Sequence, residues 1–196
     1  RSENQGVLSS VFLLACWQIL LWRLTGQASI VIGAEFDGRI EAELADALGL
    51  FERNLPYQCH LEENLTFSQL LQEARKSADE LHKWQQLFCW DNILSSSGDL
   101  SSPPFFPFCF ECREPTVSYS AAVLIFSICG RRTFTDRFKV KLSFAVADDS
   151  IVAALQYDTH LYQLPDIQRL AEQYCTLLKS VIENPEAQIS ELEILS

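Results

Sequence analysis

The sequence contains no methionine among its 196 residues, and a chain that starts at Arg1 without one is expected to be a piece of a longer protein. Basic residues are also scarce, since 15 lysines and arginines stand against 26 aspartates and glutamates, for a net charge of −11. No basic run exceeds Arg131-Arg132. Because nucleic-acid surfaces need clustered positive charge, the sequence argues against a nucleic-acid partner and favours a basic protein partner instead.

Motifs of local chemistry are missing as well. No glycine-rich dinucleotide motif, phosphate-binding loop or EF-hand spacing occurs. The three histidines, at positions 60, 82 and 160, are isolated, and nothing in the sequence brings a nucleophile to any of them. Cys109 and Cys112 form a single Cys-x-x-Cys pair, whereas a zinc site needs a second pair or two histidines. Residues i and i+3 of a strand also face opposite sides. We therefore expect packed thiols, no metal site and no complete active site.

The chain also lacks a segment long enough to cross a membrane. The apolar run 7–22 has 16 residues and contains Ser9, Ser10 and Gln18, whereas a span needs roughly 20. A helix that is apolar all round is typical of a buried core helix, and no small-residue cleavage site of a secretion signal follows it. The seven cysteines are odd in number and scattered, which favours free thiols in a reducing compartment, the cytoplasm.

Hydrophobic periodicity predicts a layered α/β sandwich in which long helices pack on a mixed sheet. Thr66 and Gln69 have the spacing of a capping box, Gly26 that of a helix C-cap, and Asp148-Asp149 that of a hairpin turn. The segment 95–104 has the composition of a loop. The expected helices are 7–24, 40–49, 66–83 and one from Pro165 to residue 184; the expected strands are 29–36, 54–61, 105–112, 121–129, 138–147 and 150–157.

The strand 54–61 shows the clearest alternation in the chain, because every second side chain is apolar. These apolar residues are Leu55, Tyr57, Cys59 and Leu61. Two charged residues, Glu52 and Arg53, stand directly at its start, where a buried strand would not be expected to carry them.

Five segments resemble, in the same order, the C-terminal half of a condensation domain from a nonribosomal peptide synthetase. Each is weak alone, but together they cover essentially the whole chain, so that 1–196 is identified as the C-terminal subdomain of such a domain. The segments are RLTGQASIVIGAEFDGR (23–39), LGLFERN (48–54), HKWQQLFCW (82–90), GDLSSPPFF (98–106) and the close of the chain, 155–196.

The resemblance implies a lobe with the chloramphenicol acetyltransferase fold, paired with an N-terminal lobe of the same domain. Peptidyl carrier proteins would deliver acyl groups on phosphopantetheine, an acceptor amine would attack the donor thioester, and no cofactor would bind to the lobe directly. The family's catalytic His-His-x-x-x-Asp-Gly motif does not occur in this chain, so the chain alone is expected to be inactive. The close of the chain resembles the part of the family that leads into an adenylation domain.

The resemblance also assigns positions. Arg39, supported by Asp37, would pair with the motif aspartate of the other lobe; alternatively it pairs only with Asp37 or Glu41 on the surface. The tunnel or motif positions that the resemblance assigns are Gly49, Phe51, Arg53, Asn54, Trp84, Gln85 and Asp99.

The chain departs from the family pattern at several of these positions. Arg53 stands where the family has asparagine, Asn54 where it has threonine, and Trp84-Gln85 in place of a His-Gln-Asp motif. Glu52 and Arg53 could therefore face the tunnel and affect what passes, or form a solvated pair. Two other functions stay open: a condensation-like platform that binds carriers or partners without making bonds, and a coenzyme-A-dependent acyltransferase of the same fold.

Overall fold

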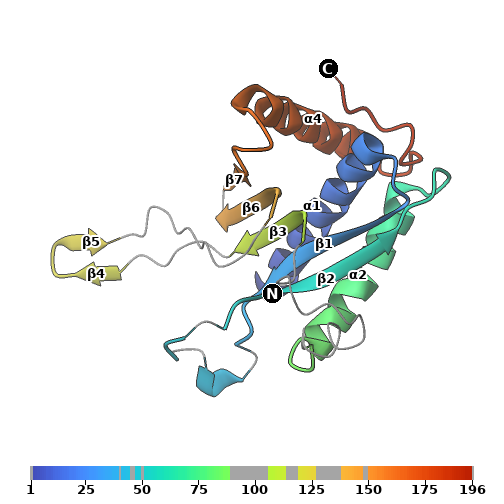
Figure 1. Cartoon of the computed structure of the whole chain (residues 1–196). Helices are drawn as coiled ribbons and strands as arrows, with labels where there is room; N and C mark the ends of the chain where they lie inside the picture. Colours follow the sequence, from blue (N-terminus) through green and yellow to red (C-terminus); the bar gives the residue numbers. More distant parts are fainter. Residues whose placement is uncertain are drawn as a thin grey trace.

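The computed structural model describes residues 2–39, 41–44, 47–49, 51–88, 106–113, 119–126, 138–147 and 150–195. The helices and strands within these ranges are α1 (Ser2–Thr25), β1 (Ser29–Phe36), the 3-10 helix η1 (Ala42–Leu44), β2 (Arg53–His60), α2 (Phe67–Trp84), β3 (Phe108–Arg113), β4 (Tyr119–Ala121), β5 (Leu124–Phe126), β6 (Val140–Ala147), β7 (Ser150–Tyr157) and α4 (Leu164–Glu183). Helices and strands alternate along the chain as far as α2, and the strands β3 to β7 then follow one another before the last helix (Figure 1).

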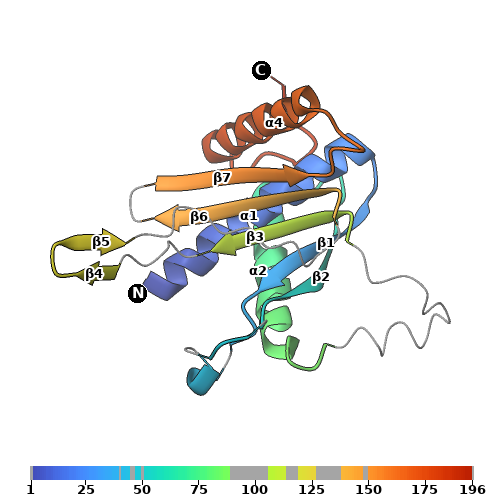
Figure 2. The same ribbon diagram turned by 60° about the vertical axis from the view of Figure 1, so that its left-hand side comes forward.

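Five strands form one mixed sheet in the order β2-β1-β3-β6-β7. The inner pairs β1·β3 and β3·β6 are parallel, while β1·β2 and β6·β7 are antiparallel. In Figure 2, α1 and α2 pass behind the strands and α4 lies above β7; all three helices pack against the same core on one face of this sheet. We call this the covered face and the opposite one the open face, since no described helix lies on it. The prediction of a mixed sheet packed by long helices is confirmed.

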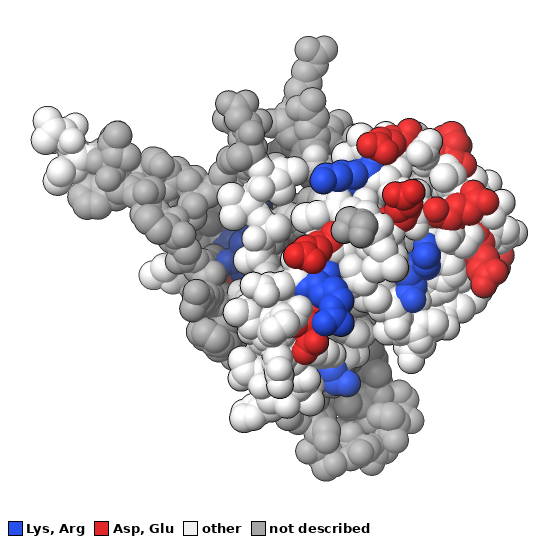
Figure 3. Space-filling model, turned by 90° about the horizontal axis from the view of Figure 1, so that it is seen from above, with Lys and Arg blue, Asp and Glu red and all other residues white. Residues whose placement is uncertain are grey.

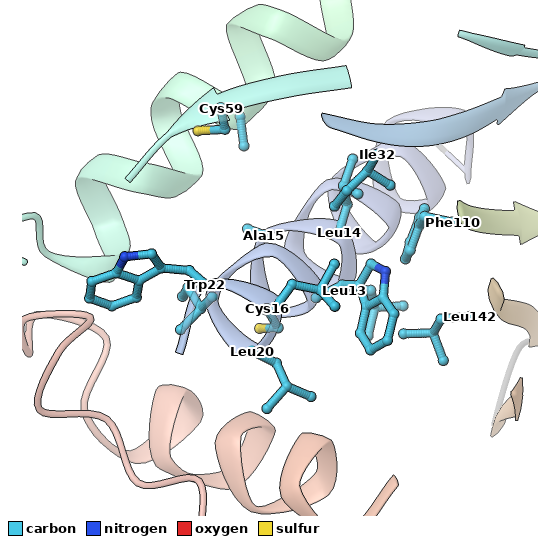
Figure 4. Packing of buried hydrophobic residues seen from close by; sticks show 14 of the residues in the cluster. Leu13, Leu14, Ala15, Cys16, Leu20, Trp22, Ile32, Cys59, Phe110 and Leu142 are labelled. Atoms are coloured by element: carbon cyan, nitrogen blue, oxygen red, sulfur yellow. The ribbon is translucent and has the colours of Figure 1, made fainter. Parts of the chain in front are cut away.

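The helix α1 lies at the centre of the core, between the sheet, α2 and α4 (Figure 4). Almost every side chain from Val11 to Trp22 is buried, so this helix is apolar all round because it touches protein on every side. The predicted core helix is thereby confirmed, although it begins at Ser2. Among the described residues, no helix has the length and hydropathy needed to span a bilayer.

Buried tyrosines connect these layers. The Tyr174 hydroxyl of α4 donates to the Leu13 carbonyl of α1 at 2.8 Å, and the Tyr57 hydroxyl of β2 donates to the Ala74 carbonyl of α2 at 2.9 Å. Both rings are almost fully buried, so each hydroxyl needs such a partner. These bonds fix the positions of α2 and α4 relative to the rest of the core.

The sequence predictions for β2 and α2 are confirmed. The alternating apolar side chains Leu55, Tyr57 and Cys59 of β2 are buried, as is Leu61 directly after it, while Gln58 and His60 are exposed. The capping box at α2 has both of its hydrogen bonds, from the Gln69 amide to the Thr66 hydroxyl and from the Thr66 amide to the Gln69 side chain. Gly26 adopts a φ of 68° and donates its amide to the Trp22 carbonyl, as a helix C-cap does.

The C-terminal segment 185–195 packs across the ends of α1 and α2. Arg23 Nη1 donates to the carbonyls of Ser190 at 2.8 Å and Leu192 at 2.9 Å, and Ile189 and Leu192 are buried. The Ile189 amide donates to the Leu65 carbonyl. The segment is therefore an integral part of the core.

Two predicted elements are wrong. The range 40–49 was expected to be a helix, but its described residues, 41–44 and 47–49, contain only the 3-10 turn η1, and 47–49 is irregular. Leu48 is fully exposed, so no apolar surface stabilises a short helix there. The expected strand 121–129 is instead a hairpin of β4 and β5, with Ala122 at a φ of 53°. An alanine at a turn gives no sequence signal. Residues 127–129, the turn at 148–149 and the loop 95–104 lie outside the described residues.

Candidate functional site

Four of the assigned residues meet at the end of β1. Arg39 Nη1 contacts Asp37 Oδ1 at 2.5 Å, and Arg39 Nη2 lies 3.4 Å from the carbonyl oxygens of both Ala47 and Gly49. The guanidinium carbon of Arg39 lies 4.7 Å from the centre of the Phe51 ring. The fold thus gathers Asp37, Arg39, Gly49 and Phe51 into one cluster in which a cation stacks on an aromatic ring.

The chain around Gly38 lies directly against the chain at Phe51, and this close contact requires glycine at position 38. Gly38 has a φ of 73°, and a Cβ atom built on it would lie 2.1 Å from the Phe51 carbonyl oxygen. Any other residue would push these two parts of the backbone apart and move Arg39 away from Phe51. The Arg39–Asp37 ion pair, one of the two alternatives that the sequence allowed, is present. The pairing of Arg39 with an aspartate of another lobe stays a prediction.

A second group of assigned residues joins the start of β2 to the end of α2. Arg53 Nη1 lies 3.4 Å from the Gln85 carbonyl, and the Gln85 side chain donates to the His82 carbonyl at 3.0 Å. Gln85 and Asn54 are buried, whereas Trp84 has 61% of its surface exposed. The ninth assigned residue, Asp99, lies outside the described residues.

Glu52 reaches a network of charges on the open face of the sheet. Arg113 Nη2 lies 3.6 Å from Glu52 Oε2 and 2.7 Å from Glu35 Oε1, and Arg113 Nε contacts Glu111 Oε1. Lys141 Nζ lies 2.6 Å from Glu35 Oε2 and 2.7 Å from Glu111 Oε2. Each of the two glutamates at 35 and 111 therefore bridges both cations.

These four residues, Glu35, Glu111, Arg113 and Lys141, form a closed ring of alternating charge, which we call the charged ring. Only 2% of the Lys141 side chain is exposed, and both ring glutamates are below 10%. The ring is neutral in itself, with two carboxylates and two cations, so the carboxylate of Glu52 is an additional charge attached to Arg113.

Sequence reasoning missed the charged ring. Its members come from β1, β3 and β6, which are neighbours in the sheet but far apart in the sequence. A signal existed in each strand, since charged side chains replace apolar ones at alternate positions of runs such as FCFECR. That alternation shows that one face is polar, but it does not show which strands lie side by side.

Two thiols of the described residues, Cys59 and Cys112, are poor candidates for nucleophiles. Burial raises the pKa of the Cys112 thiol to about 11, and burial together with the charge of Glu73 raises that of Cys59 to about 11. Cys109 and Cys112 lie on opposite faces of β3, as expected, since Cys112 packs against the core beneath the helices. Within the described ranges, no group of three or more metal-ligating side chains comes together.

Comparison with known proteins identifies the family. The family model described as "Condensation domain" matches residues 2–196. Bacitracin synthase 2 of Bacillus licheniformis is 27% identical over the whole chain, and gramicidin S synthase 2 of Aneurinibacillus migulanus is 26% identical over the same extent. The chain covers 8% and 4% of these two proteins, respectively, and thus less than a tenth of either.

Solved structures support the fold. The first condensation domain of the calcium-dependent antibiotic synthetase matches 99% of the chain with a TM-score of 0.76 at 16% identity, and the chain covers 45% of it. A four-domain nonribosomal peptide synthetase bound to AMP and glycine matches the whole chain with a TM-score of 0.81 at 17% identity, over 17% of its own length. The chain therefore has the fold found in these condensation-domain structures.

Proposed function

Because the chain belongs to the condensation-domain family of nonribosomal peptide synthetases, we propose that it is the second lobe of a domain that forms amide bonds. The observation that carries the proposal is the family match over residues 2–196, combined with coverage of somewhat less than half of a solved condensation domain. A partner of similar size, the N-terminal lobe, would complete the domain.

In the proposed reaction, the amine of an aminoacyl group attacks the carbonyl carbon of a donor thioester. A carbon–nitrogen bond forms, the carbon–sulfur bond breaks, and the phosphopantetheine thiol leaves with a proton. Both acyl groups arrive on the phosphopantetheine arms of peptidyl carrier proteins, and an adenylation domain loads the acceptor. The lobe itself needs no bound cofactor for this chemistry.

Within this chain, the proposal gives the described residues a supporting role. The catalytic histidine would come from the first lobe, and Arg39 would form an ion pair with the motif aspartate there. Arg39 is suited to this role because its side chain is still 20% exposed, and because Asp37 and Phe51 hold its guanidinium in one orientation.

The surface charge is compatible with protein partners and unfavourable to nucleic acid. Acidic side chains gather toward one side of the face shown in Figure 3, with few basic ones among them. The five described cysteines are free, which supports a place in the reducing cytoplasm.

The test is an amide-forming assay with the full-length protein, a donor carrier loaded with an acyl group and an acceptor carrier loaded with an amino acid. We expect a carrier-bound amide, detected by mass spectrometry, which disappears when the catalytic histidine of the first lobe is replaced. Binding of both carriers without product would contradict bond formation and support the platform. Product from acyl-coenzyme A but not from a loaded carrier would support the soluble-thioester acyltransferase.

A further inference from the structure

Arg39 is held by residues close to it in the chain. We call the described residues 37–39, 41–44, 47–49 and 51–52 the crossover segment; it leaves the sheet after β1 and returns as β2. The partners of Arg39 described above, namely Asp37, Ala47, Gly49 and Phe51, all belong to this segment. Those contacts fix the shape of the segment, but they do not fix its orientation relative to the sheet.

The orientation depends on contacts at the base of the segment. Phe36 and Arg53 are the last paired residues of β1 and β2, so the segment starts directly beyond them. Glu52 lies between this pairing and Phe51, and its carboxylate reaches Arg113 on β3 at 3.6 Å. This ion pair connects the crossover segment to the next strand of the sheet.

The charged ring gives Arg113 a fixed position from which to hold Glu52. The Arg113 side chain touches both ring glutamates, and the buried Lys141 closes the ring from β6. Because a guanidinium is planar and its donors are rigidly placed, two carboxylates are enough to fix its plane. The third carboxylate, Glu52, therefore meets a cation that does not move with the crossover segment.

We propose that Arg113 and Glu52 are positioning residues for the amide-forming reaction: the charged ring anchors Arg113, and Arg113 holds the crossover segment, with Arg39 and Phe51, at a fixed angle to the sheet. The inference rests on the proposed function. Since the ring is neutral without Glu52, removal of Glu52 should change the angle of the segment without unfolding the lobe.

The variant Glu52→Ala in the full-length protein tests this, with Glu183→Ala on the exposed side of α4 as a matched control. Hydrogen exchange of peptides that contain residues 47–52 should become about two- to fivefold faster, the factor that a partly exposed ion pair contributes. The kcat of amide formation should fall about tenfold, as expected when a group near the reaction is misplaced by a fraction of an ångström. The KM for each carrier and the melting temperature should stay unchanged.

Unchanged exchange in 47–52 would overturn the proposal, and so would faster exchange with an unchanged kcat. A lower melting temperature with faster exchange throughout β1 and β3 would also overturn it, because Glu52 would then be a part of the folded core. If the unmodified protein makes no amide, the proposed function fails by itself, and the exchange measurement still decides whether Glu52 holds the segment.

Discussion

The two faces of the sheet differ most clearly within a single strand. On β6, Leu142 points into the core beneath the helices, while its neighbour Lys141 belongs to the charged ring on the open face, and both are 2% exposed. The covered face is apolar across β1, β3 and β6 (Figure 4), whereas the open face holds the four charges of the ring, of which Glu35, Glu111 and Lys141 have less than a tenth of their side chain exposed.

This difference shows that the two faces of the sheet have different roles. Apolar burial on the covered face stabilises the fold in proportion to the area removed from water. A buried ion ring adds little net stability, because desolvation offsets the attraction of the charges, but it requires a defined geometry. We therefore assign stability to the covered face and the placement of the crossover segment to the open face.

The largest expected effect comes from breaking the charged ring. Replacing Lys141 by methionine keeps the length of the side chain but leaves Glu35 and Glu111 buried without their shared cation. The free energy of unfolding, measured by urea denaturation, should fall by about 3–5 kcal/mol. Lys139→Met, just outside β6, is the control and should change it little. A loss below about 1 kcal/mol for Lys141→Met would show that water already solvates the ring.

The neighbouring substitution Leu142→Ala tests the covered face. It removes buried methyl groups from the cluster around Phe110 and Phe144, and the free energy of unfolding should fall by about 2–4 kcal/mol. Varying the salt concentration then distinguishes the two faces. The stability loss caused by Lys141→Met should depend on ionic strength, whereas the loss caused by Leu142→Ala should not. Equal salt dependence of the two variants would contradict the comparison.

A smaller effect is expected at Gly33 on the open face. A Cβ atom there would lie 2.7 Å from the Phe106 ring, so Gly33→Ala should lower the free energy of unfolding by about 1–3 kcal/mol. The loss should be largely relieved when Phe106→Leu is combined with it, because the clash involves the ring. If the double variant is as unstable as the sum of the two single ones, the close packing of Phe106 on β1 is not the cause.

The smallest change, and a favourable one, is expected in α1. Gln18 is completely buried in the core, and among the described residues neither its amide nitrogen nor its amide oxygen has a hydrogen-bond partner. Gln18→Met keeps the length of the side chain and removes the unsatisfied polar atoms, so the protein should become more stable by about 1–2 kcal/mol. Thermal denaturation is sufficient to detect this, and a destabilised variant would indicate a polar partner for Gln18.

Much of the fold could be predicted because its signals are local. The alternation in β2, the capping box at Thr66 and the all-round apolar character of α1 each follow from residues within one element, and each is confirmed. The failures occur where local patterns have no tertiary support. A helix was predicted over 40–49, but the exposed Leu48 has no surface on which to pack.

The site was predictable only in part. The resemblance to condensation domains identified the residues around Arg39, and the structure brings Asp37, Gly49 and Phe51 to it. It gave no indication of Glu35 or Lys141, whose proximity depends on strand order, and strand order is set by packing between distant parts of the chain. The two charges at the start of β2 are now distinguished: Glu52 faces Arg113, while Arg53 faces the end of α2.

The most direct test of the account is the single-turnover rate of amide formation by the full-length protein with Arg39 replaced by glutamine. Glutamine keeps some hydrogen-bonding ability but removes the charge and the stacking on Phe51. We expect the rate to fall at least about tenfold, with a melting temperature equal to that of the unmodified protein. An active protein whose rate is unchanged by Arg39→Gln would contradict the claim that this lobe acts in the reaction through its crossover segment.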